Sequence, residues 1–171
     1  MKKWLWYGMV WVGLGIGVSC ASKSQVYKKP DFHFQNQKIF IVPFENMTNT
    51  PKAGHIVAKL IDAEFRIQGN RYVEFMEDGE KETLSETKAL EKAKSHKAQF
   101  LLIGTVTEFR YRKGFSENPA IGFTAKLIAT DSKEIVWTIT LSDSSEPFVT
   151  SALTANELTQ KMARQIVESM R

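Results

Sequence analysis

The run Phe100-Leu101-Leu102-Ile103-Gly104 is the most apolar stretch of the chain after residue 20. Its side chains do not alternate between apolar and polar, which is typical of a strand that is covered on both faces. From Thr105 to Tyr111 the polarity becomes mixed, as expected where a strand leaves the core. The run therefore predicts the central strand of a sheet with other elements packed on both sides.

The segments that follow this run predict a β-hairpin. Residues 121 to 129 alternate cleanly between apolar and other side chains, which indicates a strand with one buried face. Asp131-Ser132-Lys133 predicts a tight turn, and residues 134 to 141 (EIVWTITL) return as the partner strand. The inward side chains are predicted to be Ile121, Phe123, Ala125, Leu127 and Ala129.

The segments before the central run predict two strands and two helices. Residues 38 to 43 (KIFIVP) indicate a buried strand that a proline stops. Thr50 and Pro51 are typical of an N-cap and a first helical residue, and that helix is expected to end at Gly69-Asn70. Residues 71 to 76 predict a second strand, and residues 85 to 97 a weaker amphipathic helix.

A last helix is predicted at the C-terminal end. Thr154 and Glu157 have the spacing of a capping box, and apolar residues then recur every four positions. The predicted order is β-α-β-α-β-β-β-α. This order predicts an α/β (α+β) fold, with a mixed sheet of about five strands and helices packed against it.

The first twenty residues have the features of a secretory signal. Lys2 and Lys3 are followed by an uncharged run from Trp4 to Val18, which is short for a membrane-spanning helix. Cys20 comes directly after and is the only cysteine, so it cannot form a disulfide within the chain.

The stretch Gly17-Val18-Ser19-Cys20 resembles the lipobox of bacterial lipoproteins, although the usual residue at Gly17 is leucine. The resemblance implies that Cys20 is acylated, with palmitate among its chains, and becomes the first residue of the mature protein. The residue after it is Ala21 rather than aspartate, which favours the outer membrane, facing the periplasm. The alternative is ordinary cleavage nearby, with Cys20 left as a free thiol or removed with the signal.

These features predict three parts of the chain. Residues 1–19 are the signal peptide, residues 20–37 are the lipidated cysteine and a flexible polar tether, and residues 38–171 are one periplasmic domain. An extended tether of this length would lift the domain a few nanometres from the membrane. The formal charge of +4 includes both signal lysines, so no nucleic-acid partner is expected.

The sequence contains no recognisable active site. His33, His55 and His96 lack metal-ligand spacing, and His55 is expected on a solvated helix face. No nucleophile elbow, phosphate loop or dinucleotide fingerprint is present, and Glu45 is a single carboxylate without a partner at known spacing. We therefore expect no enzyme, no metal and no cofactor.

Two loops are candidates for binding a partner, since loops on rigid scaffolds commonly carry function. In the first loop, residues 44–50, the polar side chains could instead serve only as hydrogen-bond partners for backbone amides of the turn and of the helix start. The second interleaves aromatic and basic residues and could be a solvated hairpin, a contact for an acidic partner, or a contact for anionic lipid headgroups. The candidate residues are Phe44, Glu45, Asn46, Thr48, Asn49, Arg110, Tyr111, Arg112 and Phe115.

Three segments together resemble one group of lipoproteins. Residues 39–49, 98–106 and 127–137 are similar to segments of lipoproteins related to the penicillin-binding-protein activator LpoB and to the curli secretion lipoprotein CsgG. Two positions depart from that pattern. Lys133 replaces a turn glycine, which puts the usual positive-φ turn in doubt, and Lys97-Ala98-Gln99 replaces Gly-Ala-Asp.

The resemblance implies one of two functions. Membrane-spanning hairpins need about 10 residues per strand, and the predicted loops at residues 112–120 and 142–152 are short and polar, which argues against a pore of the curli type. What remains is a tethered domain that binds and stimulates a peptidoglycan synthase, a penicillin-binding protein. The alternative is a component of a secretion or envelope assembly complex, with a homo-oligomer left open.

Overall fold

The strand β5 (Phe100–Arg110) lies inside the sheet, as its apolar run predicts. The structure, a computed structural model, describes residues 23–35, 37–76, 84–111, 118–144 and 153–171. Within these ranges the sheet is open and has seven strands in the order β1-β7-β6-β5-β2-β4, with β3 paired to β5 beyond the end of β2. The predicted fold class is confirmed, although the sheet has two more strands than expected.

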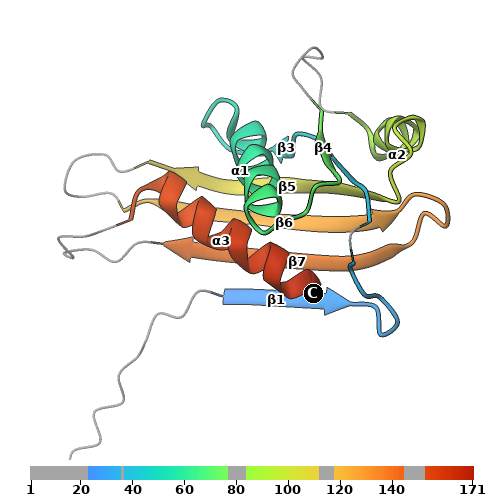
Figure 1. Cartoon of the computed structure of the whole chain (residues 1–171). Coiled ribbons are helices and arrows are strands. Elements are labelled where there is room, and N and C mark those ends of the chain that lie inside the picture. Colours follow the sequence, from blue (N-terminus) through green and yellow to red (C-terminus); the bar gives the residue numbers. More distant parts are fainter. Residues whose placement is uncertain (1–22, 36, 77–83, 112–117, 145–152) are drawn as a thin grey trace, which may run out of the picture.

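The strands fall into an antiparallel and a parallel half (Figure 1). The antiparallel half consists of β5, β6 (Ala120–Ala129), β7 (Ile135–Ser144) and the edge strand β1 (Lys23–Lys28). The parallel half adds β2 (Ile39–Ile41), β3 (Glu45–Asn46) and β4 (Val73–Phe75). The predicted hairpin is therefore confirmed as β6 and β7.

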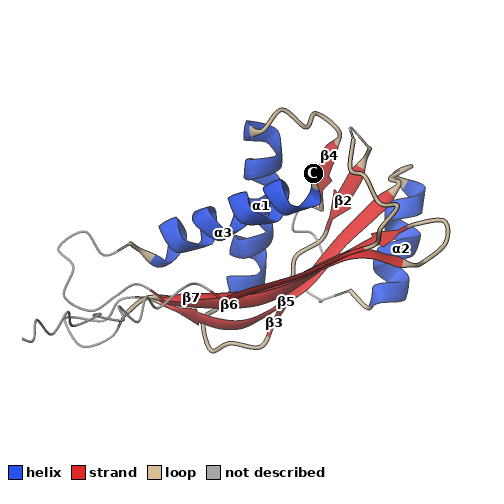
Figure 2. Ribbon diagram, turned by 90° about the horizontal axis from the view of Figure 1, so that it is seen from below, coloured by secondary structure: helices blue, strands red, loops and turns tan. Residues whose placement is uncertain are grey.

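Helices cover the two faces of the sheet unequally. Figure 2 shows α1 (Ala53–Ile67) and α3 (Ala155–Met170) on one face and α2 (Glu86–Ser95) on the other. Consecutive residues of a strand point to opposite faces, so Leu102 enters the core beneath α1 and α3 while Leu101 enters the smaller core beneath α2. Burial of each leucine contributes about 1.5–3 kcal/mol.

The start of α1 differs from the prediction. The helix begins at Ala53, and its N-cap is Lys52 in the left-handed conformation (φ 61°) without a side-chain cap, rather than Thr50. The hydroxyl of Thr50 instead donates to the carbonyl of Phe109 at 2.7 Å. Gly69 adopts φ 88° just after the helix, which agrees with the predicted end.

The capping box of α3 is confirmed. The hydroxyl of Thr154 accepts from the amide of Glu157 at 3.2 Å, and the Glu157 carboxylate accepts from the amide of Thr154 at 2.7 Å. The four apolar residues predicted to recur along this helix are all buried: Leu158, Met162, Ile166 and Met170.

One prediction about local structure is wrong, and one doubt raised by the sequence is removed. Residues 23 to 28, expected to belong to a flexible tether, form β1 and pair with β7 from Lys23↔Ser142 to Lys28↔Trp137. Lys133 adopts φ 60°, so the turn between β6 and β7 keeps its positive φ without glycine. Within the described residues, no helix is long and apolar enough to cross a membrane.

Candidate functional site

The first candidate loop is held together by its own polar side chains. The Asn46 carboxamide donates to the carbonyl of Thr50 at 2.8 Å and accepts from the amide and the hydroxyl of Thr48 at 3.0 and 2.8 Å. The Thr48 hydroxyl in turn accepts from the amide of Thr50 at 3.1 Å. These bonds give Asn46 and Thr48 the structural role that the simpler of the two hypotheses predicts, and their role in binding a partner stays a prediction. Asn49, between Thr48 and Thr50, is exposed.

Phe44 belongs to the core and is unavailable to a partner. It is 3% exposed, and its ring contacts Phe123 edge-on with centroids 6.3 Å apart. Its prediction as a binding residue is wrong because two glycines make room for it. A Cβ at Gly54 would lie 1.8 Å from the carbonyl oxygen of Phe44, and a Cβ at Gly104 would lie 2.4 Å from its ring.

The structure brings the two candidate loops into contact. The short strand β3 pairs with Thr105 and Val106 of β5, and the amide of Met47 donates to the carbonyl of Val106 at 2.9 Å. The bond from Thr50 to Phe109 then fastens the loop to the end of β5. Residues that the sequence separates by about sixty positions thus form one surface.

The second candidate region continues from this surface. The Arg110 guanidinium forms an ion pair with Glu108 at 2.8 Å and is otherwise exposed. Tyr111 is 44% exposed, and its ring contacts Phe109 edge-on at 5.2 Å. Arg112 and Phe115, as well as the predicted lipidation site Cys20, lie outside the described residues.

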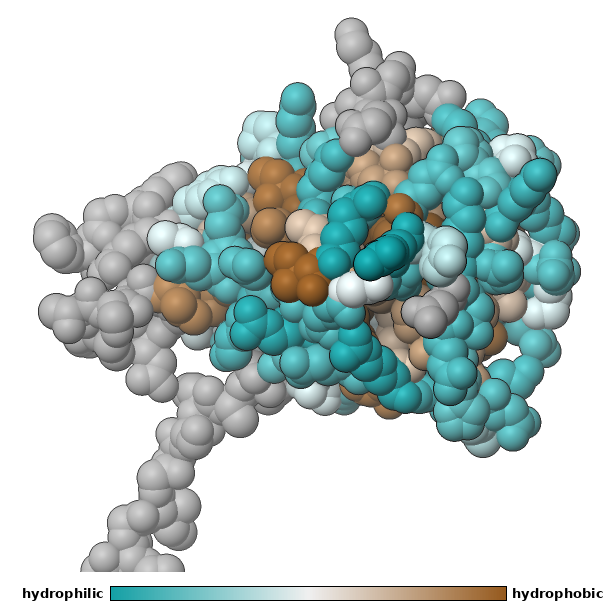
Figure 3. All heavy atoms as spheres, in the orientation of Figure 1, coloured by the Kyte–Doolittle hydropathy of each residue, from teal (hydrophilic) through white to brown (hydrophobic). Residues whose placement is uncertain are grey.

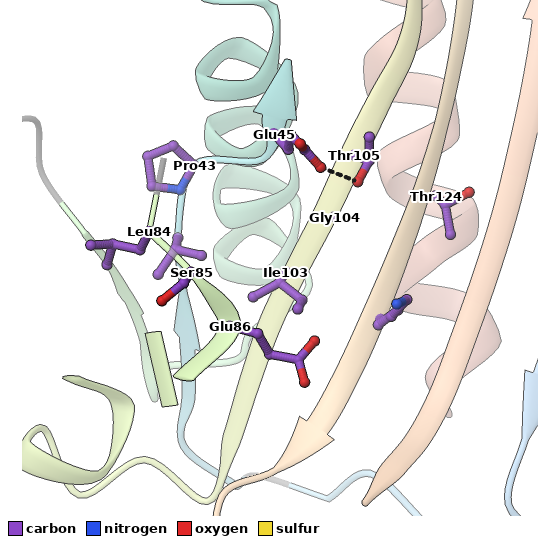
Figure 4. Close-up of a pocket in the computed structure, with 11 residues that line it drawn as sticks. Pro43, Glu45, Leu84, Ser85, Glu86, Ile103, Gly104, Thr105 and Thr124 are labelled. Carbon is purple, nitrogen blue, oxygen red and sulfur yellow. Dashed lines mark hydrogen bonds between the residues drawn. The ribbon is translucent and has the colours of Figure 1, made fainter. Parts of the chain in front are cut away.

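A cleft of about 440 Å³ lies beside the first loop, on the face of the sheet that carries α2. Figure 4 shows Glu45 at its upper side, where its carboxylate accepts from the hydroxyl of Thr105 at 3.2 Å, and Glu86 below. The cleft is therefore half polar, with carboxylates from β3 and α2. Its lining consists of Val42, Pro43, Glu45, Leu84, Ser85, Glu86, Ile103, Gly104, Thr105, Thr124 and Lys126.

The charged groups near the other end of the sheet stabilise β4. Glu74 forms an ion pair with Lys38 at 2.7 Å, and its carboxylate lies at hydrogen-bond distance, 2.6 Å, from the Nδ1 atom of His96. The hydrogen bond from Lys38 is the main cause that lowers the pKa of Glu74, with His96 adding to it against the effect of burial. His55, expected on a solvated face, instead contacts the edge of the Phe75 ring at 5.4 Å.

No group of three or more histidine, cysteine or acidic side chains within metal-binding reach occurs among the residues that the structure describes. Sequence patterns did not single out Met47, which is 65% exposed next to the candidate residues. On the face seen in Figure 3, which carries α1 and α3, apolar residues lie in small separate groups among hydrophilic ones. Only the pairing of β3 with β5 reveals the place of Met47.

Comparison with known proteins identifies the fold but no family. No family model matches the chain, and no curated protein matches it. Among solved structures, the PelC dodecamer from Paraburkholderia phytofirmans is similar, with 23% identity and a TM-score of 0.72 over 88% of this chain and 97% of that chain. At this identity the likeness shows the fold alone.

Two further solved structures are less similar, and one of them is a lipoprotein. Lipoprotein GNA1162 from Neisseria meningitidis has 14% identity and a TM-score of 0.50, over 79% of this chain and 99% of that chain. The C-terminal domain of LpoB from Salmonella enterica has 14% identity and a TM-score of only 0.34, over 63% of this chain and 82% of that chain. A score of 0.34 is too low to equate the two folds.

Proposed function

We propose that this chain is a lipoprotein of the bacterial envelope, anchored to the outer membrane through Cys20. It assembles with copies of itself and binds other envelope proteins rather than catalysing a reaction. The likeness to PelC carries the proposal, since it extends over 97% of that chain and the structure concerned is a dodecamer. The signal sequence and its lipobox supply the anchor.

The outer edge of β1 supports self-assembly. The amide of Lys29 donates to the carbonyl of Val136 in β7, so alternation along an antiparallel strand turns the backbone groups of Ser24, Val26 and Lys28 away from the sheet. Such an edge pairs readily with another strand unless it is blunted. Val26 and Tyr27 are both about half exposed there, which adds apolar surface to the free backbone groups.

The native mass of the full lipidated protein in mild detergent tests this function. We expect a defined multimer that persists on dilution, and a single protomer at every concentration would contradict self-assembly. Val26→Lys places a charge on the β1 edge and should shift the population to smaller species. Tyr72→Lys is the matched control, since Tyr72 is exposed and directly precedes β4, at the opposite edge of the sheet from β1.

The second candidate function is stimulation of a peptidoglycan synthase, which would then be the partner. It rests on the resemblance of residues 39–49, 98–106 and 127–137 to LpoB-related lipoproteins. These segments include β2, β3, the start of β5 and the whole β6–β7 turn. Cross-linking in the envelope followed by purification should recover a penicillin-binding protein. Recovery of lipid without any protein partner would contradict this candidate.

A further inference from the structure

We propose that one end of the sheet, formed by the start of β1 and the end of β5, rests directly on the membrane surface in which Cys20 is anchored. The inference depends on the lipidation of Cys20 proposed above. The inference identifies the end of the protein that faces the lipid headgroups. It also means that no long flexible tether of the kind that the sequence predicts separates the domain from the membrane.

The distance from the anchor to the folded domain is short. β1 begins at Lys23, so only Ala21 and Ser22 separate it from Cys20. Three steps along even a fully extended chain span about 10 Å. Since β1 is hydrogen-bonded to β7 along its whole length, the domain cannot move further from the membrane without breaking those bonds.

The register of the sheet identifies the end that must face the membrane. Lys23 pairs with Ser142 in β7, Ser144 pairs with Ala120 in β6, and Ala120 pairs with Arg110 in β5. Figure 1 shows the start of β1, the ends of β5 and β7 and the start of α3 at the same end of the molecule. Adjacent strands are about 4.8 Å apart, so the end of β5 lies within about 15 Å of the start of β1.

The side chains at this end suit a lipid surface. Tyr111 directly follows β5 and Leu153 precedes the N-cap of α3, and they are 44% and 38% exposed. Tyrosine is favoured at membrane interfaces because its ring is apolar while its hydroxyl remains hydrated.

The charges at this end are also compatible with anionic headgroups. Two of its carboxylates are neutralised within the protein, since Glu108 pairs with Arg110 at 2.8 Å and Asp143 pairs with Lys161 at 2.9 Å. An unpaired carboxylate facing anionic headgroups would be repelled. This end therefore combines exposed apolar groups with two ion-paired carboxylates, while the exposed Glu157 carboxylate accepts from the amide of Thr154 in the capping box of α3.

The proposal sets the orientation of the whole domain. The long strands β5, β6 and β7 stand upright, and at about 3.4 Å per residue they extend roughly 35 Å from the membrane. The far end carries the β6–β7 turn and the start of β4. The outer edge of β1 then runs away from the membrane and stays open to a neighbouring copy in the same membrane.

Fluorescence quenching in vesicles tests which end touches lipid. The probe is a tryptophan at the proposed contact, in Tyr111→Trp, and separately in Leu153→Trp in case the first substitution perturbs folding. The natural Trp137 is fully buried and contributes a constant background. The lipidated protein is reconstituted into vesicles of phosphatidylethanolamine and phosphatidylglycerol, with and without brominated acyl chains. We expect both probes to lose emission when the lipid is brominated.

Two controls complete the design. Tyr72→Trp places the probe at an exposed tyrosine just before β4, at the far end of the sheet, and should keep its emission. A Gly-Ser linker of about 15 residues between Ala21 and Ser22, with a root-mean-square span of about 20 Å, should abolish quenching of Tyr111→Trp.

The outcomes separate the inference from its premise. Failure of the protein to float with the vesicles would contradict the anchor and, with it, the membrane-facing end. Flotation without quenching at Tyr111 and Leu153, or with equal quenching at Tyr72, would overturn the inference while leaving the anchored lipoprotein intact.

Discussion

At the scale of single residues, the absence of a side chain at Gly104 shapes the candidate surface. A Cβ there would lie 2.4 Å from the ring of Phe44 and 2.5 Å from the carbonyl oxygen of Thr124. The glycine therefore lets Phe44 turn into the core, while the next residue, Glu45, stays exposed and lines the cleft. The side chains of these consecutive residues point in different directions, so Glu45 is available to a partner and Phe44 is not.

We predict that Gly104→Ala destabilises the domain by about 1–3 kcal/mol, because the added methyl group must displace Phe44 or the β6 backbone. The midpoint of denaturant unfolding measures the change. Gly122→Ala is the matched control in the same sheet, since its nearest neighbour would be the flexible Thr107 hydroxyl at 3.2 Å. Equal stability of the Gly104 and Gly122 variants would contradict the proposed packing of Phe44.

At the scale of elements, short edge strands depend on partners from elsewhere in the chain. β4 has three residues and, within the part of the chain that the structure describes, pairs with β2 alone. Its middle residue, Glu74, is held by Lys38 just before β2 and by His96 at the C-cap of α2. Lys38 also donates to the carbonyl of His96 at 2.7 Å, so one small network joins β2, β4 and α2.

We predict that Glu74→Gln lowers stability by about 1 kcal/mol or less, because the pair is partly exposed and screened by solvent. The folded-state pKa of Glu74 is lowered from 4.5, first by Lys38. The stabilisation is therefore present above pH 4.5 and is lost as the pH falls through the lower folded pKa. Unfolding measured against pH should show this loss in the wild type and a flatter profile in the variant.

Glu91→Gln on α2 provides the control for that measurement, since Glu91 is also an exposed carboxylate. Its pH profile should follow that of the wild type. An identical profile for Glu74→Gln would show that the Lys38–Glu74–His96 network contributes nothing to stability.

At the scale of the whole molecule, β1 changes how the anchor works. A flexible tether would let the domain search the space above the membrane. With β1 paired to β7, the anchor that we propose at Cys20 would lie three residues from the sheet, and the domain would be held upright at a constant height. Neighbouring copies would then present the same sheet edge at the same height, which favours their association in the membrane plane.

We predict that Cys20→Ala leaves the domain folded but releases it from the membrane, because the acyl chains supply the attachment. Fractionation of the envelope measures the release, and circular dichroism checks the fold. Ser22→Ala, two positions after the anchor, is the matched control and should stay with the outer membrane. If Cys20→Ala still sediments with that membrane, the lipoprotein interpretation is wrong.

The sequence by itself determined the elements whose signals are local. The apolar run at residues 100–104, the alternation of residues 121–129 and the capping box at Thr154 each depend on neighbours a few positions away. The tertiary structure alone decided β1, β3, the burial of Phe44 and the union of the two candidate loops. These features depend on contacts between distant residues, such as Thr50 with Phe109, 59 positions apart, and no short window of sequence contains both partners.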